Sequence, residues 1–216
     1  MALRLHTYWR SSASYRVRIA LNLKGLEYEA IPRHLLRGGG EHKSTDYLAL
    51  NPQGLLPGLE DDGLFISQSL AICEYLDEKY PDPPLLPGDP AGRATVRAMA
   101  LAVACDIHPL NNLSVLAYLR EQMGQPPEAV NDWVRHWISR GFAALEQSIA
   151  RHTLDATYCF GDRVSLADVC LVPQVYNARR FDTDLTRFPL IVKVCSCLEA
   201  QPAFAAARPE VQPDAE

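Results

Sequence analysis

Residues 52–80 read PQGLLPGLEDDGLFISQSLAICEYLDEKY, and no other stretch says more about the fold of the first part of the chain. Two short apolar runs flank an Asp-Gly pair at 62–63, which is typical of a tight turn between antiparallel strands. From Gln68 and Ser69 onward the apolar residues recur with helical spacing. We therefore predict a β-hairpin that leads directly into an α-helix.

The same stretch carries groups suited to a small acidic peptide. A cis bond between Leu56 and Pro57 would leave the main chain of Leu56 open to pair with an extended peptide as an added strand. The amides at the start of the following helix, with the Ser69 hydroxyl, would bind a carboxylate, because unpaired N–H groups and the helix dipole both favour negative charge. The structural alternative is an ordinary trans bond before Pro57 and Ser69 as a helix N-cap.

The composition is that of a globular protein. The chain has 216 residues, of which 48% are hydrophobic, and this length permits one large core or two modest ones. The formal net charge of -5 argues against a nucleic-acid or anionic-membrane surface. No apolar run approaches the roughly 20 residues of a membrane span, and the N-terminus lacks a signal-peptide pattern. We expect a cytoplasmic protein that binds neither nucleic acid nor membrane.

The six cysteines form no recognisable metal or redox motif. No C-x-x-C pair and no zinc-type spacing of Cys and His occurs, so the sequence predicts no metal site. Most of the cysteines lie in apolar helical contexts, where a reduced cysteine behaves as a small hydrophobic residue. Their positions are 73, 105, 159, 170, 195 and 197.

The N-terminal part has the pattern of a compact α/β domain. Residues 3–8 alternate as a strand, residues 15–24 have the spacing of a helix that ends at Gly25, and residues 28–32 form a second candidate strand. Together with the hairpin and its helix, these elements predict a mixed four-stranded sheet. We place this domain at residues 1–82.

Residues 83–91 continue a proline-dense passage that begins at residue 81, and such a passage is typical of a domain linker. Beyond it we predict an all-α domain over residues 92–216. Its last residues, 208–216, have the pattern of an extended polar tail. The helices expected in this domain are residues 94–118, 127–151, 165–176 and 189–200.

Ser165 and Asp168 have the spacing of a capping box just before an apolar run, with Asp in place of the usual Glu or Gln. A cap of this kind stabilises a helix by about 1 kcal/mol without touching a ligand. We therefore assign this pair to folding.

The loop after the first strand reads RSSAS at residues 10–14 and offers hydroxyls where a redox thioredoxin would need C-x-x-C. The chain therefore cannot perform disulfide exchange at this turn. A hydroxyl of Ser11 or Ser12 at a helix start can, however, donate to a thiolate that a ligand delivers, and the helix dipole and Arg10 would add to that stabilisation. The structural alternative is that both serines are helix caps.

Five features together resemble the zeta class of glutathione transferases: SSASYRVRIAL at residues 11–21, the loop at 51–57, QSLAI at 68–72, the proline-rich linker, and the capping box at 165–168. The resemblance covers essentially the whole chain. It implies the glutathione transferase fold, with an α/β thioredoxin-like N-terminal domain and an all-α C-terminal domain. It also implies glutathione as the cofactor and a homodimer.

By motif, Ser11 matches the catalytic serine of the class, and Ser12 is its neighbour at the helix start. One position departs from the class pattern Ser-Ser-Cys, because Ala13 stands in place of the cysteine. Any role of that thiol in handling glutathione is absent here, and this absence bears on side activities such as dehalogenation more than on isomerisation. Activation of glutathione by serine stays possible.

The resemblance also assigns the groups that would hold glutathione. Leu56, before Pro57, would pair with the cysteinyl backbone of glutathione, while Gln68 and Ser69 would hold its γ-glutamyl end.

In the second domain the resemblance points to a basic residue for the substrate. Arg180 matches an arginine that the class places at the substrate site, and its guanidinium would bind a carboxylate through two parallel hydrogen bonds. Arg179 fits a solvated surface position better. His108 and Asn112 lie in a polar break where Pro109 predicts a kink, and either a binding role or a structural role fits both residues.

The activity implied is cis–trans isomerisation of a small dicarboxylic maleyl compound. A glutathione thiolate that adds to the double bond makes it single, rotation becomes easy, and elimination then gives the trans product. The run NLSVL at residues 112–116 favours maleylacetoacetate as the substrate and fumarylacetoacetate as the product. The alternatives are a maleylpyruvate isomerase, a conjugating or peroxidase transferase, and a non-catalytic interaction module with the same fold.

Overall fold

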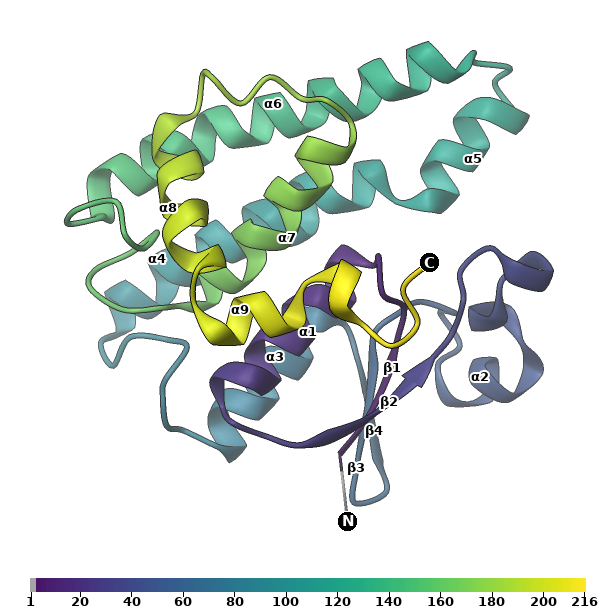
Figure 1. Cartoon of the computed structure of the whole chain (residues 1–216), viewed down its shortest axis with the longest axis horizontal. Coiled ribbons are helices and arrows are strands. Elements are labelled where there is room, and N and C mark those ends of the chain that lie inside the picture. Colours follow the sequence, from purple (N-terminus) through teal and green to yellow (C-terminus); the bar gives the residue numbers. More distant parts are fainter. Residues whose placement is uncertain (1–2) are drawn as a thin grey trace. The chain divides into compact units, whose positions relative to one another are not determined.

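The structure is a computed structural model that describes residues 3–216. The chain forms two compact units, whose elements are labelled in Figure 1. The first comprises the residues up to Leu85 together with Gln201–Glu216, and the second comprises Leu86–Ala200. The division after Leu85 falls inside the proline-rich passage. The C-terminal residues differ from the prediction, since they group with the α/β unit and not with the helical one.

The first unit contains the predicted mixed sheet, with the strand order β2-β1-β3-β4. β1 pairs in parallel with β2 and antiparallel with β3, and β3 forms the predicted hairpin with β4. Leu5, at the centre of β1, lies opposite Ala30 on one side and Leu59 on the other, and it is fully buried. The strands are β1 (Leu3–Thr7), β2 (Tyr28–Pro32), β3 (Gly58–Asp61) and β4 (Leu64–Ser67).

The helix α1 (Ser12–Leu23) connects the two parallel strands and begins three residues earlier than predicted. It ends before Gly25, whose φ of 63° suits the left-handed position after a helix. α1 contacts both α3 (Ser69–Lys79) and α9 (Pro202–Ala207) (Figure 1), so its side chains are buried around most of the helix. The short helix α2 (Thr45–Leu50) precedes the loop into β3.

A C-terminal segment joins the first unit because α9 packs against α1. Asn22 Nδ2 donates to the carbonyl of Ala203 at 2.9 Å, and Arg18 Nε donates to the carbonyl of Ala207 at 3.1 Å. These partners are 181 and 189 residues apart in sequence, so local sequence patterns do not predict the two contacts.

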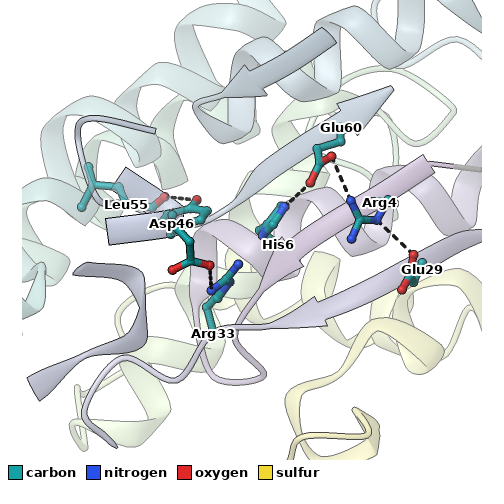
Figure 2. Close-up of polar contacts among 8 residues, drawn as sticks. Arg4, His6, Glu29, Arg33, Asp46, Leu55 and Glu60 are labelled. Atoms are coloured by element: carbon teal, nitrogen blue, oxygen red, sulfur yellow. Dashed lines mark hydrogen bonds and ion pairs between the residues drawn. The ribbon is translucent and has the colours of Figure 1, made fainter. Parts of the chain in front are cut away.

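A polar network crosses the sheet from β1 (Figure 2). His6 is 2% exposed, and its Nε2 lies 2.5 Å from Glu60 Oε1 on β3. Arg4 binds Glu60 at 3.0 Å and Glu29 on β2 at 3.1 Å. The Tyr47 ring from α2 lies 5.3 Å from the His6 ring. One cluster therefore ties three strands together and fixes α2 beside them.

The pH dependence of stability should report on Glu60. The hydrogen bond from His6 holds the pKa of Glu60 below its ordinary value of 4.5, and Arg4 acts in the same direction. As the pH falls, the Glu60 carboxylate therefore takes up a proton in the unfolded chain before it does so in the folded chain. The stability that ionised Glu60 contributes is fully present above about pH 4.5, and it is lost as the pH falls through the lower pKa that Glu60 has in the folded chain.

We expect the stability difference between the wild type and Glu60→Gln, measured by urea unfolding, to shrink below about pH 4.5. Glu27 is an exposed carboxylate for which the described residues show no partner, so Glu27→Gln is the matched control. The free energy of unfolding of Glu27→Gln, plotted against pH, should run parallel to that of the wild type. If the free energy of unfolding of Glu60→Gln also runs parallel to that of the wild type, the stabilising role of ionised Glu60 is contradicted.

The second unit is all α, as predicted. The helix α7 is its centre, since most of its side chains are buried and it contacts both α4 and α8. The sequence predicts that this helix ends at residue 176, but α7 extends to Arg180. Arg179 and Arg180 are therefore its last two residues and do not belong to the loop after it. The helices are α4 (Pro90–Leu101), α5 (Leu113–Glu121), α6 (Pro127–His152), α7 (Leu166–Arg180) and α8 (Pro189–Glu199).

The predicted kink near Pro109 is present, and the break is longer than one residue. A π-helical turn, Ala102–Ile107, and a 3-10 turn, His108–Asn111, separate α4 from α5. Gly141 on α6 allows the close approach of this segment, because a Cβ there would lie 2.3 Å from Ile107 Cδ1. Such interruptions of a helix are frequent at functional sites.

By length and composition alone, the helical stretch Pro90–Glu121 would be long enough to cross a membrane. Core helices of globular proteins share this length and composition, so the stretch does not by itself indicate a membrane span; 33% of its most apolar 18-residue segment is buried. Within residues 3–216, no group of three or more His, Cys, Asp or Glu side chains is placed to hold a metal ion.

Candidate functional site

The predicted catalytic serine lies at the N-terminus of α1. Ser11 is the N-cap, and its Oγ accepts a hydrogen bond from the amide of Ser14 at 3.2 Å. This cap uses a lone pair of the hydroxyl oxygen and leaves its proton available for donation. The amides of Ser12 and Ala13 have no partner within the helix, because they belong to its first turn. Capping and donation to an anion are therefore compatible roles for Ser11.

Two neighbours of Ser11 add to the anion-binding character of this end of α1. Ser12 is the first helical residue and is 7% exposed. The Arg10 guanidinium lies 5.4 Å from the centroid of the Trp9 ring, a distance typical of a cation–π contact. The helix dipole and the positive charge in the preceding loop both favour a negative group here.

The loop that leads into β3 is held by side chains and leaves one main-chain segment unpaired. Tyr47 Oη and Asn51 Nδ2 both donate to the carbonyl of Leu55, at 2.7 and 2.8 Å. The Leu56-Pro57 peptide bond is cis, as the sequence suggested. Across residues 3–216, neither the amide nor the carbonyl of Leu56 takes part in a hydrogen bond. Both groups are therefore available to an extended peptide.

The start of α3 differs from the simplest prediction. Gln68, not Ser69, is the N-cap, and its side chain does not cap the helix, so the alternative that Ser69 is the N-cap is wrong. Gln68 has φ 70° and ψ 117°, a backbone conformation that side-chain-bearing residues rarely adopt and that tends to cluster at functional sites. Gln68 Nε2 instead donates to Gln53 Oε1 at 2.8 Å. The first amides of α3 therefore have no side-chain cap and are open to an anion.

Arg16 is a buried cation that contacts Ser69, and it was not identified from the sequence. Arg16 on α1 is 1% exposed, and its Nη1 donates to Ser69 Oγ at 3.1 Å. Its Nε and Nη2 have no hydrogen-bond partner among the described residues. A buried charge without a counterion is costly, so this position favours an anion at the start of α3. The signal in the sequence was an arginine within the apolar run YRVRIAL at 15–21.

The remaining predicted residues belong to the second unit. Arg180 is exposed at the end of α7, where its guanidinium lies 5.5 Å from the Phe181 ring centroid. Arg179 forms an ion pair with Glu199 at 2.5 Å, which is the surface role weighed for it. Asn112 is the N-cap of α5 and accepts the Ser114 amide at 3.0 Å, so its structural role is realised.

His108 is half-buried at the start of the 3-10 turn. Its neighbour Asn111 is a further candidate that the sequence did not indicate. Asn111 is 9% exposed, and neither its side-chain nitrogen nor its oxygen has a hydrogen-bond partner in the part of the chain that the structure describes. Such an orphaned amide is uncommon in a native protein and marks a place where a ligand or water would bind.

The first unit thus brings together most of the predicted groups for glutathione. The Arg16–Ser69 hydrogen bond joins α1, which carries Ser11, to the start of α3. The Gln53–Gln68 hydrogen bond joins the loop before Leu56 to the same helix end. The arrangement offers a hydroxyl donor, an unpaired stretch of main chain and a buried positive charge, which are the groups that would bind a peptide with a thiolate and a carboxylate.

Comparison with known proteins agrees with this chemistry. Residues 5–84 match the glutathione S-transferase N-terminal domain, and residues 98–202 match the C-terminal domain. The probable maleylacetoacetate isomerase of Vibrio cholerae is 55% identical over 100% of this chain and 99% of its own length. A maleylpyruvate isomerase of a Ralstonia species is 49% identical, over 98% and 99%.

Solved structures agree as well. The holo structure of maleyl pyruvate isomerase, described as a bacterial glutathione S-transferase of the zeta class, has a TM-score of 0.95 and 48% identity, over 99% of this chain and 100% of that one. A maleylacetoacetate isomerase from Anaeromyxobacter dehalogenans with glutathione bound in the active site has a TM-score of 0.88 and 43% identity, over 100% and 98%. The chain belongs to the glutathione S-transferase family and, within it, to the zeta class.

Proposed function

We propose that this chain is a glutathione-dependent cis–trans isomerase that converts maleylacetoacetate to fumarylacetoacetate in the breakdown of aromatic amino acids. The observation that carries the proposal is the α1 N-terminus, where the Ser11 hydroxyl keeps a proton to donate and the loop contains no thiol. At such a site any sulfur nucleophile has to come from a ligand. Full-length relatives named as maleylacetoacetate isomerases support the same reaction.

The residues present fit glutathione. The buried Arg16 guanidinium, with two unpartnered nitrogens, and the uncapped start of α3 suit a γ-glutamyl carboxylate. The unpaired main chain of Leu56 suits a peptide backbone. The residues that would hold the cofactor are Ser11, Ser12, Leu56, Pro57, Gln68 and Ser69, with His108 and Asn112 as further candidates from the second unit.

Glutathione, when bound, supplies a thiolate that adds reversibly to the double bond and so permits rotation. The Ser11 hydroxyl would donate to that thiolate, and the α1 dipole and Arg10 would favour its negative charge. A preference of about 2.7 kcal/mol for the thiolate corresponds to a pKa lowered by about two units. Arg10 and Arg180 would bind the substrate carboxylates, and Ser12 would serve as a second donor to the thiolate.

A second substrate is favoured by specific relatives. A maleylpyruvate isomerase is 49% identical to this chain, and the holo structure of maleyl pyruvate isomerase has a TM-score of 0.95. The two substrates share the maleyl carboxylate and differ in the far tail. We further propose that the protein is cytoplasmic and acts as a homodimer.

The substrate is tested by comparing kcat/KM for both maleyl compounds at saturating glutathione, with loss of the cis compound followed by absorbance. We expect the higher value with maleylacetoacetate. A higher value with maleylpyruvate would move the chain to the second substrate, and no isomerisation of either would overturn the proposal. An aryl halide and an organic hydroperoxide test for conjugating or peroxidase activity in the same preparation.

Arg180→Ala should raise KM for the maleyl substrate about 10- to 100-fold and change kcat less, because a hydrogen bond to a charged group contributes roughly 1.5–3 kcal/mol to binding. The matched control is Arg179→Ala, which removes the neighbouring exposed arginine that is paired with Glu199. The control should leave KM unchanged. An equal KM for Arg180→Ala and wild type in steady-state assays would remove Arg180 from the substrate site.

A further inference from the structure

The C-terminal tail, residues 208–216, is not the solvated extension that its sequence predicts. After α9 it forms a 3-10 turn, Pro209–Val211, and the Gln212 side chain donates to the carbonyls of Ala206 and Arg208 at 3.0 and 2.8 Å. The chain then reaches the loop between β1 and α1. There, Asp214 Oδ2 accepts the main-chain amide of Trp9 at 2.9 Å.

Trp9 lies inside the turn that presents Ser11. The amide of Ser11 donates to the carbonyl of Tyr8 at 3.0 Å, so residues 8–11 form a closed turn with Trp9 in its second position. A shift of the Trp9 main chain would therefore move the Ser11 hydroxyl. Asp214 is the group that holds the amide side of this turn.

The carbonyl side of the same turn is held by Arg18, which is 1% exposed. Its guanidinium donates to the carbonyls of Tyr8 and Trp9, at 3.4 and 2.9 Å, and also to the carbonyl of Ala207 at the end of α9. The turn and the C-terminal segment thus share one buried arginine. The Trp9 peptide units are clamped between Arg18 and Asp214.

A second anchor lies at the end of the tail. Glu216 Oε1 binds Arg37 Nη2 at 2.5 Å, and Glu216 Oε2 lies 3.5 Å from His34 Nε2. Arg37 and Glu216 are both more than half exposed, so this ion pair contributes little by itself. The hydrogen bond from Trp9 to the Asp214 carboxylate is half-buried and charge-assisted, which makes it the stronger of the two contacts.

We propose that Asp214 is a positioning residue for catalysis: the C-terminal tail fixes the turn that aims the Ser11 hydroxyl at the ligand thiol. Misplacement of a catalytic group by about 1 Å can cost on the order of a hundredfold in rate. The catalytic consequence rests on the proposed function. The ordering of the turn does not, because the hydrogen bonds of Arg18 and Asp214 to the Trp9 main chain lie within this chain.

The first test measures amide hydrogen exchange at Ser11 and Ser14 in the ligand-free protein. Asp214→Ala should speed exchange at both amides about tenfold or more, while amides in α3 keep their wild-type rates. Asp214→Asn retains an acceptor oxygen and should restore most of the protection. The matched control is Glu210→Ala in the same tail, because within residues 3–216 the Glu210 side chain shows no hydrogen bond or ion pair.

The second test measures the apparent pKa of bound glutathione, from the ultraviolet absorbance of its thiolate, together with kcat and KM. Asp214→Ala should raise this pKa and lower kcat about tenfold with little change in KM for the maleyl substrate, and Asp214→Asn should fall between Asp214→Ala and the wild type.

If the wild type does not isomerise maleyl compounds, the proposed function fails, and the exchange data still decide whether Asp214 orders the turn. If the wild type is active, the proposal is overturned when Asp214→Ala matches Glu210→Ala in both exchange and thiol pKa. Should Asp214→Ala not fold, Asp214→Asn and a chain that ends at Pro213 provide the same comparison. Wild-type exchange and thiol pKa in the shortened chain would equally overturn the proposal.

Discussion

Ser11→Ala is expected to lower kcat about 10²- to 10³-fold, which is the typical loss when one preorganised donor to a developing anion is removed. The Ser11 hydroxyl belongs to the N-cap residue of α1, and its proton is not used by the cap. KM for glutathione should change little, because Leu56, Ser69 and the buried Arg16 remain. Steady-state kinetics with glutathione varied separate the two parameters.

Ser11→Ala removes the helix cap of α1 as well as the hydroxyl donor, and a Ser11→Gly variant separates the two effects. Alanine at an N-cap costs about 1 kcal/mol of helix stability, whereas glycine costs only a few tenths. Ser11→Gly should therefore lose as much activity as Ser11→Ala with nearly wild-type stability. Ser11→Thr keeps a hydroxyl and should keep most of the activity. Full activity in the glycine variant would transfer the role to Ser12 or to the amides of α1.

Asp168→Ala should lower the free energy of unfolding by about 3–5 kcal/mol, because it leaves buried donors without a partner. Asp168 is fully buried and accepts the amides of Cys159 and Ser165, both at 2.8 Å, and the Ser165 hydroxyl at 2.7 Å. The capping box that the sequence predicts is thus present, and it also ties down the loop before α7. Urea unfolding monitored by circular dichroism measures the loss.

Two variants separate burial from capping. Asp168→Asn keeps one acceptor oxygen and should lose less stability than Asp168→Ala. Asp184 also accepts a backbone amide, that of Thr186 at 3.0 Å, but it is exposed, so Asp184→Ala should cost less than about 1 kcal/mol. Equal losses in Asp168→Ala and Asp184→Ala would contradict the account of Asp168 as a buried structural carboxylate.

The elements of the fold were accessible from the sequence because their signals are local. The Asp-Gly turn at 62–63, the glycine after α1 and the capping box at 165–168 each lie within a few residues of the structure that they determine. The sequence does not indicate that residues 201–216 pack with the α/β unit, because this packing depends on hydrogen bonds from α1 to partners about 180 residues away. No periodicity reports a contact of that kind.

The site shows the same limit. Ser11 and Gln68 were identified because each stands at a recognisable helix start, although Ser69 was one position from the true cap. Arg16 was missed because an arginine in a helix is usually at the surface, and only packing on both sides of α1 buries it. The Asp214–Trp9 hydrogen bond spans 205 residues and leaves no sequence pattern.

The most direct measurement of the central claim is isomerisation by the purified chain from which glutathione has been removed completely. The account predicts no rate above the uncatalysed background, full recovery when glutathione is added, and none with S-methylglutathione, whose sulfur cannot become a thiolate. Isomerisation at an undiminished rate without glutathione would contradict the claim that the attacking sulfur comes from the ligand.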